Sequence, residues 1–141
     1  GATDTVDASE DPGKVQDAIL NLTDGVGVDV SLDAAGFAKT CEAAVMAARR
    51  GGRMIQVGLP IGSDLPVVPM GRVAGREIEI LGSHGLDAAD MPAILQLVKR
   101  RKLLVRSLVG REVSLTEGAK AIQDMDRGSP VGITMITNFQ S

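Results

Sequence analysis

Three glycines that close apolar runs are the residues best placed to meet a ligand. Gly36, Gly58 and Gly82 each follow a stretch with the composition of a strand. A glycine has no Cβ, so a flat or extended ligand can approach its main chain and be recognised by backbone N–H and C=O groups. The alternative at each position is a glycine that only makes a tight turn. Because the pattern recurs at three strand ends, it favours a shared binding cleft.

Few side chains could act as nucleophiles or metal ligands. The single cysteine, Cys41, and the single histidine, His84, cannot build a disulfide, a four-thiolate zinc site or a three-ligand catalytic zinc site. Cys41 lies on the apolar stripe of a predicted helix, which favours a buried small hydrophobe. His84 follows a predicted strand end, where a lone histidine is more often a loop residue than a ligand contact. The basic run 99–102 is typical of a solvated helix end.

The composition indicates one ordinary soluble domain. The 141 residues are 44% hydrophobic and carry 15 Lys+Arg against 18 Asp+Glu, a net charge of −3. Nucleic acid or an anionic membrane would call for a basic surplus, and two phenylalanines give no stacking platform for single strands. No apolar run reaches the roughly 18 residues that cross a bilayer, and residues 1–13 are acidic and polar, unlike a signal peptide. We expect a cytoplasmic protein without nucleic-acid or membrane partners.

Strands and helices alternate along the predicted chain. Strands are predicted over residues 3–7, 28–34, 53–59, 77–81 and 133–137, and residues 62–75 are predicted as mostly loop with room for one helical turn. A first helix is predicted to begin at Asp11-Pro12, and a second to run through Cys41 to Ala48 and end at residues 49–52. A third helix is predicted after Asp87. A fourth is predicted to begin at a Ser114–Glu117 capping box and to stop near Gly128. The segment GVGVDV (25–30) follows a helix and opens a strand, so it is not a dinucleotide fingerprint. The alternation implies parallel pairing and an α/β fold.

Four segments, in this order and at this spacing, resemble the C-terminal half of zinc-dependent medium-chain alcohol dehydrogenases. They are GATDTVD (1–7), GVGVDVSLDAAG (25–36), RRGGRMIQVGLP (49–60) and REIEILGS (76–83), and the likeness runs to about Phe139. The resemblance implies a Rossmann-like parallel sheet flanked by helices, with strand order 3-2-1-4-5-6. This chain would supply strands 3 to 6 and be truncated at the N-terminal side. Residues 1–84 would form a partial dinucleotide-binding domain, and residues 85–141 helices and a strand returning toward the catalytic domain.

The resemblance also implies a cofactor and its contacts. NAD or NADP would exchange hydride with a small-molecule alcohol or aldehyde. Ala34, Ala35 and Gly36 would line the adenosine side, with Phe37 near the adenine. Backbone groups of Val57, Gly58, Leu59, Leu81, Gly82 and Ser83 would touch the nicotinamide and its carboxamide. Family dimers pair sheets across the last strand, which implies a homo-oligomer formed through sheet edges.

The resemblance assigns no catalytic residue and no metal ligand to this chain. The zinc ligands, the glycine-rich phosphate loop and the acidic residue for the ribose hydroxyl would all lie N-terminal to Gly1. The 141 residues alone are therefore expected to be inactive. Two alternatives stay open: part of a zinc-free quinone or enoyl reductase of the same superfamily, and a non-catalytic nucleotide-binding or self-associating module.

Overall fold

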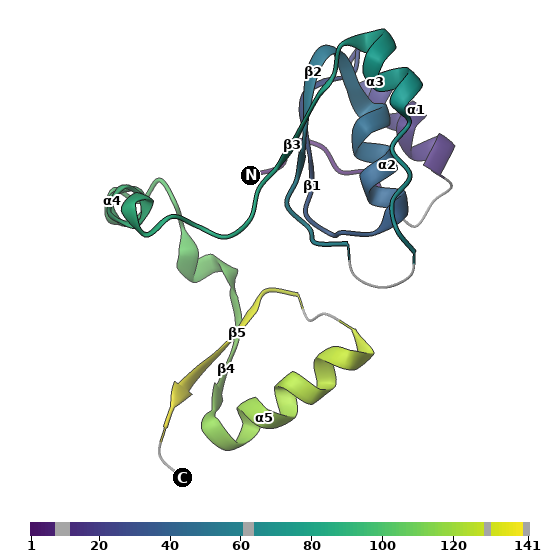
Figure 1. The fold of residues 1–141 in the computed structure, drawn as a ribbon. Helices are drawn as coiled ribbons and strands as arrows, with labels where there is room; N and C mark the ends of the chain where they lie inside the picture. Colours follow the sequence, from purple (N-terminus) through teal and green to yellow (C-terminus); the bar gives the residue numbers. More distant parts are fainter. Residues whose placement is uncertain (8–11, 61–63, 129–130, 140–141) are drawn as a thin grey trace. The chain divides into compact units, whose positions relative to one another are not determined.

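The computed structural model describes residues 1–7, 12–60, 64–128 and 131–139 (Figure 1). The chain divides into two units, Gly1–Gly85 and Leu86–Ser141. No helix within the described ranges is long and apolar enough to span a membrane. Asp11, the predicted N-cap of the first helix, lies outside the described residues.

The first unit is built on a three-stranded parallel sheet. Its strands are β1 (Val28–Asp33), β2 (Ala48–Gln56) and β3 (Glu79–Gly82), in the order β1-β2-β3. The register pairs Leu32 with Ile55 and Ile55 with Leu81, so the three carboxyl ends meet at one edge of the sheet. The helices α1 (Pro12–Leu22), α2 (Ala38–Ala47) and α3 (Met70–Arg76) lie on one face of this sheet (Figure 1). The predicted parallel α/β architecture is confirmed.

A small apolar core joins α2 to the sheet. Cys41 and Val45 from α2 pack against Met54 from β2, and these side chains are at most 4% exposed. Ala44 and Val73 pack on the edge of the cluster. The prediction that Cys41 is a buried small hydrophobe is confirmed. Burial, together with the nearby charges of Asp33 and Glu42, raises the pKa of its thiol.

The helices cover the polar side of β1. Ser31 and Asp33 are 9% and 3% exposed, whereas Val30 and Leu32, which alternate with them along the strand, are 47% and 62% exposed. The Ser31 hydroxyl is satisfied by donating to the Ala44 carbonyl at 2.7 Å. Strands of a parallel sheet are usually covered on both faces. Among the described residues of this unit, helices cover one face only, which leaves the apolar side of β1 exposed.

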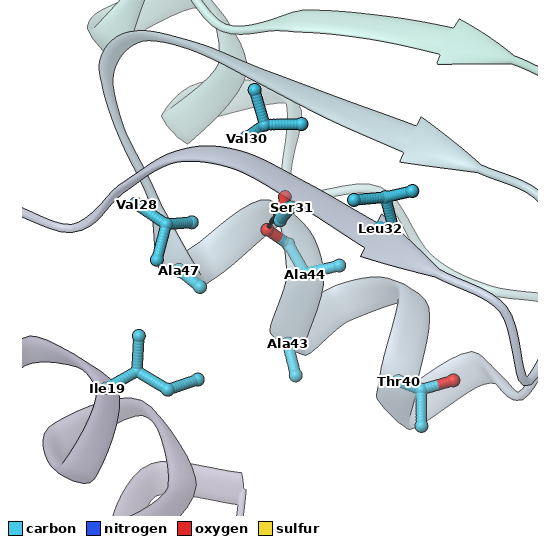
Figure 2. Close-up of a pocket in the computed structure, with 9 residues that line it drawn as sticks. All are labelled: Ile19, Val28, Val30, Ser31, Leu32, Thr40, Ala43, Ala44 and Ala47. Carbon is cyan, nitrogen blue, oxygen red and sulfur yellow. Dashed lines mark hydrogen bonds between the residues drawn. The ribbon is translucent and has the colours of Figure 1, made fainter. Parts of the chain in front are cut away.

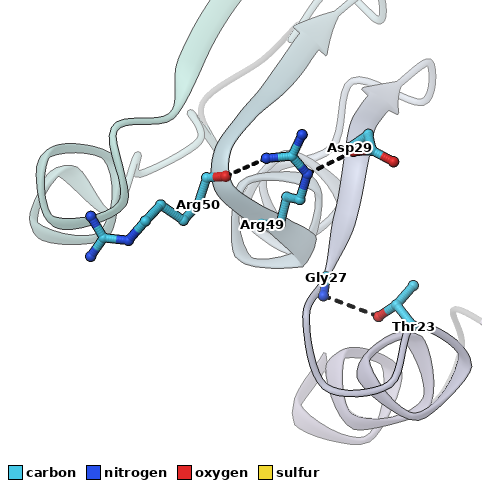
Figure 3. A network of polar contacts seen from close by, with 5 residues as sticks. All are labelled: Thr23, Gly27, Asp29, Arg49 and Arg50. Atoms are coloured by element: carbon cyan, nitrogen blue, oxygen red, sulfur yellow. Dashed lines mark hydrogen bonds and ion pairs between the residues drawn. The ribbon is translucent and has the colours of Figure 1, made fainter.

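The strand β2 begins at Ala48, earlier than the predicted start at Arg53. Residues 49–52 were predicted to end a helix, but they lie in β2, and Arg49 Nε forms an ion pair with Asp29 Oδ1 at 2.6 Å (Figure 3). A register shift between Val28 and Val30 accommodates the extra length. Gly27, whose N–H donates to Thr23 Oγ1, has a φ of 97°, and a Cβ there would lie 2.6 Å from the Ala47 carbonyl oxygen. This close approach requires a glycine where β1 begins.

Other boundaries also differ from the prediction. Residues 3–7 form no strand, so the sheet holds three of the four strands that the resemblance implied for this region. A strand there would need a neighbour, because sheet hydrogen bonds are made between strands. Residues 62–75 were predicted as mostly loop with room for one helical turn, and the helix found there, α3, is longer and spans Met70–Arg76. Glu77 ends α3 in the left-handed region at φ 55°, so β3 begins at Glu79 and not at Glu77.

In its described residues, the second unit contains a two-stranded parallel sheet and two α-helices. Its elements are η1 (Ala88–Asp90), α4 (Met91–Lys99), η2 (Val105–Leu108), β4 (Val109–Ser114), α5 (Leu115–Asp124), η3 (Met125–Arg127) and β5 (Ile133–Asn138). The strand β4, which the sequence pattern did not predict, pairs with β5. The predicted capping box is confirmed: Glu117 N–H donates to Ser114 Oγ, and Ser114 N–H donates to Glu117 Oε2.

Candidate functional site

A cavity of about 330 Å³ lies at the carboxyl ends of β2 and β3. Its lining residues are Gln56, Val57, Gly58, Leu59, Pro60, Gly82, Ser83 and His84. Ligands of open parallel sheets bind outside the carboxyl ends of the strands. His84 is in the loop after β3, as predicted, and it also contributes to the wall of this cavity. Gln56, Pro60 and His84 are the lining residues that were not predicted as site residues.

The buried carboxylate of Asp33 joins the loop after β1 to the turn after β2. Asp33 Oδ1 accepts hydrogen bonds from Ala35 N–H at 3.0 Å, Gly36 N–H at 3.2 Å and Thr40 Oγ1 at 2.9 Å. Asp33 Oδ2 accepts from Gln56 Nε2 at 2.6 Å. Burial raises the pKa of Asp33, but the hydrogen bonds from Gln56, Thr40, Gly36 and Ala35 outweigh it and lower the pKa below the ordinary value. Asp33 is therefore ionised at neutral pH.

Main-chain hydrogen bonds connect all three strand ends. The Asp33 carbonyl accepts from Val57 N–H at 2.9 Å and Gly58 N–H at 2.8 Å. The Gln56 carbonyl accepts from Ser83 N–H at 2.9 Å. Gln56 Nε2 also donates to the Gly58 carbonyl at 2.7 Å. The one polar residue within the run Met54–Val57 could have signalled this network, because a polar side chain in an apolar strand needs a partner.

The structure requires a glycine at two of the three positions of the sequence pattern, for a reason that does not apply at the third. A Cβ on Gly58 would lie 2.3 Å from the Gly36 nitrogen, and a Cβ on Gly36 would lie 2.8 Å from the Leu59 carbonyl oxygen. Gly36 also has a φ of +76°. These two glycines let two loops touch each other. A Cβ on Gly82 would meet nothing within 4 Å, so at Gly82 the space beside the main chain is open.

The remaining predicted contacts lie outside the lining of this cavity. Ala34 and Ala35 are exposed after β1, Gly36 is buried there, and Phe37 is 69% exposed just before α2. Leu81 lies in β3 and is 44% exposed. The strand order nevertheless places the ends of β1 and β2 side by side, and Gly36 is in contact with Gly58.

A second cavity, of about 300 Å³, lies beside β1 (Figure 2). It is lined by Ile19, Val28, Val30, Ser31, Leu32, Thr40, Ala43, Ala44 and Ala47. Its two hydroxyl groups already have partners: the Ser31 hydroxyl donates to the Ala44 carbonyl, and Thr40 Oγ1 donates to Asp33 Oδ1 and accepts from Phe37 N–H. A binding site needs a few convergent polar groups to orient a ligand. The cavity at the ends of β2 and β3 is therefore the better candidate.

The described part of the chain holds no group of three or more His, Cys, Asp or Glu side chains that could bind a metal ion. A catalytic zinc ion takes three protein ligands. The residues present do not fit a zinc site, and no step through zinc is assigned to them.

The fold is that of Rossmann-type alcohol dehydrogenases. An alcohol dehydrogenase from Aeropyrum pernix superposes with a TM-score of 0.79 at 27% identity, covering 97% of this chain and 38% of that one. A structure described as an NAD-dependent alcohol dehydrogenase superposes with a TM-score of 0.80 at 26% identity, covering 95% of this chain and 37% of the other.

The chain belongs to the zinc-binding dehydrogenase family, whose sequence model matches residues 1–100. D-arabitol-phosphate dehydrogenase from Enterococcus avium is 30% identical over 139 residues, which are 98% of this chain and 38% of that protein. A sorbitol dehydrogenase from Halalkalibacterium halodurans is 26% identical over 86% of this chain and 35% of its own length. The chain thus spans little more than a third of the length of these relatives.

Proposed function

We propose that this chain is the cofactor-binding part of an NAD(P)-dependent zinc alcohol dehydrogenase. The observation that carries the proposal is the cavity at the carboxyl ends of β2 and β3, beside the open main chain of Gly82, in a member of the zinc-binding dehydrogenase family. A bound nicotinamide cofactor would supply hydride transfer to or from an alcohol carbon. The role of this chain is to bind and orient the cofactor.

The proposed contacts divide between two regions. Ala34, Ala35, Gly36 and Phe37 hold the adenosine side, and Val57, Gly58, Leu59, Leu81, Gly82 and Ser83 hold the nicotinamide side. The N–H of Gly58 is bonded to Asp33 and its C=O to Gln56, so Gly58 offers close approach and not a hydrogen bond. The N–H of Ser83 is likewise bonded to the Gln56 carbonyl, and the N–H of Val57 to the Asp33 carbonyl. Hydrogen bonds to the carboxamide are therefore left to other main-chain groups of residues 57–60 and 81–84.

The proposed enzyme needs groups that these 141 residues do not supply. We place its zinc ligands, glycine-rich phosphate loop and substrate-binding groups in the part of the relatives' length that this chain does not span. Residues 1–84 form the partial dinucleotide-binding domain, and residues 85–141 return toward the catalytic domain. Taken alone, the 141 residues would bind cofactor weakly and turn over no substrate.

The proposed substrate is an alcohol interconverted with a carbonyl compound. Several relatives are named for polyols or their phosphates, including D-arabitol-phosphate dehydrogenase and sorbitol dehydrogenase, which favours a polyol. The quinone or enoyl reductase alternative is not favoured, because a mycobacterial quinone oxidoreductase matches at only 20% identity, which shows the fold alone. We further propose a cytoplasmic protein that forms homo-oligomers through sheet edges, since β3 pairs with β2 alone among the described strands.

Saturation-transfer NMR of the 141-residue chain with NADH tests the proposal. We expect transfer to both the nicotinamide and the adenine protons, with affinity in the millimolar range and no oxidation of polyols. A Gly82→Val variant adds a side chain whose Cβ meets no atom within 4 Å, and it should abolish transfer to the nicotinamide. The matched control is Gly71→Val in α3, where a Cβ also meets nothing. Absence of transfer to the wild-type chain would refute cofactor binding, and micromolar affinity would refute the view that much of the site is missing.

A further inference from the structure

The side-chain amide of Gln56 holds the turn after β2. Gln56 Nε2 donates to Asp33 Oδ2 at 2.6 Å and to the Gly58 carbonyl at 2.7 Å. The Gln56 side chain is half-buried, and its bond to the Asp33 carboxylate is assisted by charge, which makes such bonds shorter and stronger than neutral ones. One group therefore joins a carboxylate on β1 to the main chain of the turn.

The amide can adopt only one orientation. Its two neighbours, the Asp33 carboxylate and the Gly58 carbonyl, are both acceptors, so the NH2 group must face them. Gln56 Oε1 is buried and has no hydrogen-bond partner among the described residues. A buried acceptor without a donor is unfavourable. This arrangement persists because turning the amide over would set its oxygen against two other oxygens.

The two oxygens of Asp33 serve two different loops. Oδ1 accepts from Ala35 N–H, Gly36 N–H and Thr40 Oγ1, and so holds the loop after β1. Oδ2 accepts from Gln56, which in turn fixes Gly58 in the turn after β2. Removing the Gln56 amide would release the Gly58 carbonyl while leaving the three bonds to Oδ1 in place.

We propose that Gln56 is a positioning residue for the nicotinamide half of the cofactor, an inference that rests on the proposed function. The Asp33 carbonyl holds the N–H groups of Val57 and Gly58, and Gln56 adds the hold on the Gly58 carbonyl, so that the wall of the cavity at Val57–Leu59 forms before a ligand binds. A preformed wall spares the ligand the entropy of ordering it. The loop at Ala34–Phe37, which would face the adenosine half, is held by three hydrogen bonds to Asp33 Oδ1, and Gln56 makes none of these three. Gln56 therefore acts directly on the turn that would face the nicotinamide half, and reaches the adenosine half only through Asp33.

The test compares the two halves of the cofactor as separate ligands of the full 141-residue chain. ¹⁵N-resolved NMR titrations with nicotinamide mononucleotide and with AMP are run on wild type and on Gln56→Met, which keeps the length of the side chain and removes its donor. The control is Gln16→Met, the same substitution at a half-buried position of α1. Hydrogen exchange at the Val57 and Gly58 amides reports on the turn without any ligand.

We expect Gln56→Met to bind nicotinamide mononucleotide about tenfold more weakly than wild type, to bind AMP equally well, and to exchange the Val57 and Gly58 amides faster. Gln16→Met should match wild type in all three. Equal weakening of both ligands would indicate a general structural role and overturn the inference, as would unchanged nicotinamide mononucleotide binding or unchanged exchange. If the wild-type chain binds neither ligand, both the proposed function and the inference fail. If the wild-type chain binds nicotinamide mononucleotide and Gln56→Met binds it equally well, the inference alone fails.

Discussion

The contact between Gly36 and Gly58 gives the sharpest prediction. In Gly58→Ala the new Cβ would lie 2.3 Å from the Gly36 nitrogen and 2.8 Å from the carbonyl carbons of Ala34 and Ala35. All three neighbours are backbone atoms, so no flexible side chain can move aside. Gly58 is not among the glycines with a positive φ, so the predicted effect comes from overlap alone. Overpacking of this kind costs about 3 kcal/mol, the upper part of the usual range.

Urea unfolding, followed by circular dichroism, measures this effect. With a denaturant slope of about 1.5 kcal/mol/M, a loss of 3 kcal/mol lowers the midpoint by about 2 M. The matched control is Gly75→Ala in α3, where the new Cβ meets nothing within 4 Å. Since alanine is the better helix former, the control should be more stable by about 0.5 kcal/mol. A Gly58→Ala chain within about 0.5 kcal/mol of wild type would refute the claim that the two loops are locked together.

Three further predictions concern the core and the Asp33 network. The pKa of Asp33 in the folded chain lies below its ordinary value of 3.8, so the ionised carboxylate stabilises the fold above that pH. This stabilisation is lost as the pH falls through the folded pKa. Asp33→Asn should therefore flatten the acid limb of a plot of stability against pH, and an unchanged acid limb would contradict the role assigned to Asp33. Cys41 is 4% exposed and the pKa of its thiol is raised, so an aromatic disulfide reagent should modify Cys41 only when urea unfolds the chain. Rapid labelling of the native chain would contradict the burial of Cys41. Met54 is 1% exposed, so Met54→Ala should lower the free energy of unfolding by about 2–5 kcal/mol. Met54→Leu, which nearly conserves the volume, should lower it by less than about 1.5 kcal/mol. Equal losses for the two variants in thermal unfolding would contradict the place of Met54 in the core.

The alternation of elements was readable from the sequence because it depends on local patterns. The apolar spacing on α2 and the Ser114–Glu117 pair at the start of α5 are set by residues within a few positions of each other. Both predictions are confirmed. The three glycines that mark the strand ends were visible for the same reason, and the parallel order then brings those ends to one edge.

Features that depend on distant partners were not readable. The early start of β2 depends on pairing with β1 and on the contact of Arg49 with Asp29, twenty residues earlier. The strand β4 likewise depends on a distant partner, because its hydrogen bonds are made to β5. The segment 3–7 has the composition of a strand, yet a strand needs a neighbour to satisfy its backbone groups, and the described sheet gives it none.

The candidate site was predicted in part. The predicted positions 57–59, 82 and 83 line the cavity at the ends of β2 and β3, and their role as cofactor contacts stays a prediction. The Asp33–Gln56 network was not predicted, because a hydrogen bond over 23 residues leaves no periodic signal in the sequence. The glycine pattern likewise did not distinguish Gly36 and Gly58, which are required by mutual contact, from Gly82, which borders open space.

A crystal structure of the 141-residue chain soaked with NADH at high concentration tests the central claim most directly. We predict density for the nicotinamide in the cavity between Gln56–Pro60 and Gly82–His84, with the adenosine toward Ala34–Phe37. Density for the cofactor in the apolar cavity beside β1, or none at the three strand ends under saturating conditions, would contradict the account.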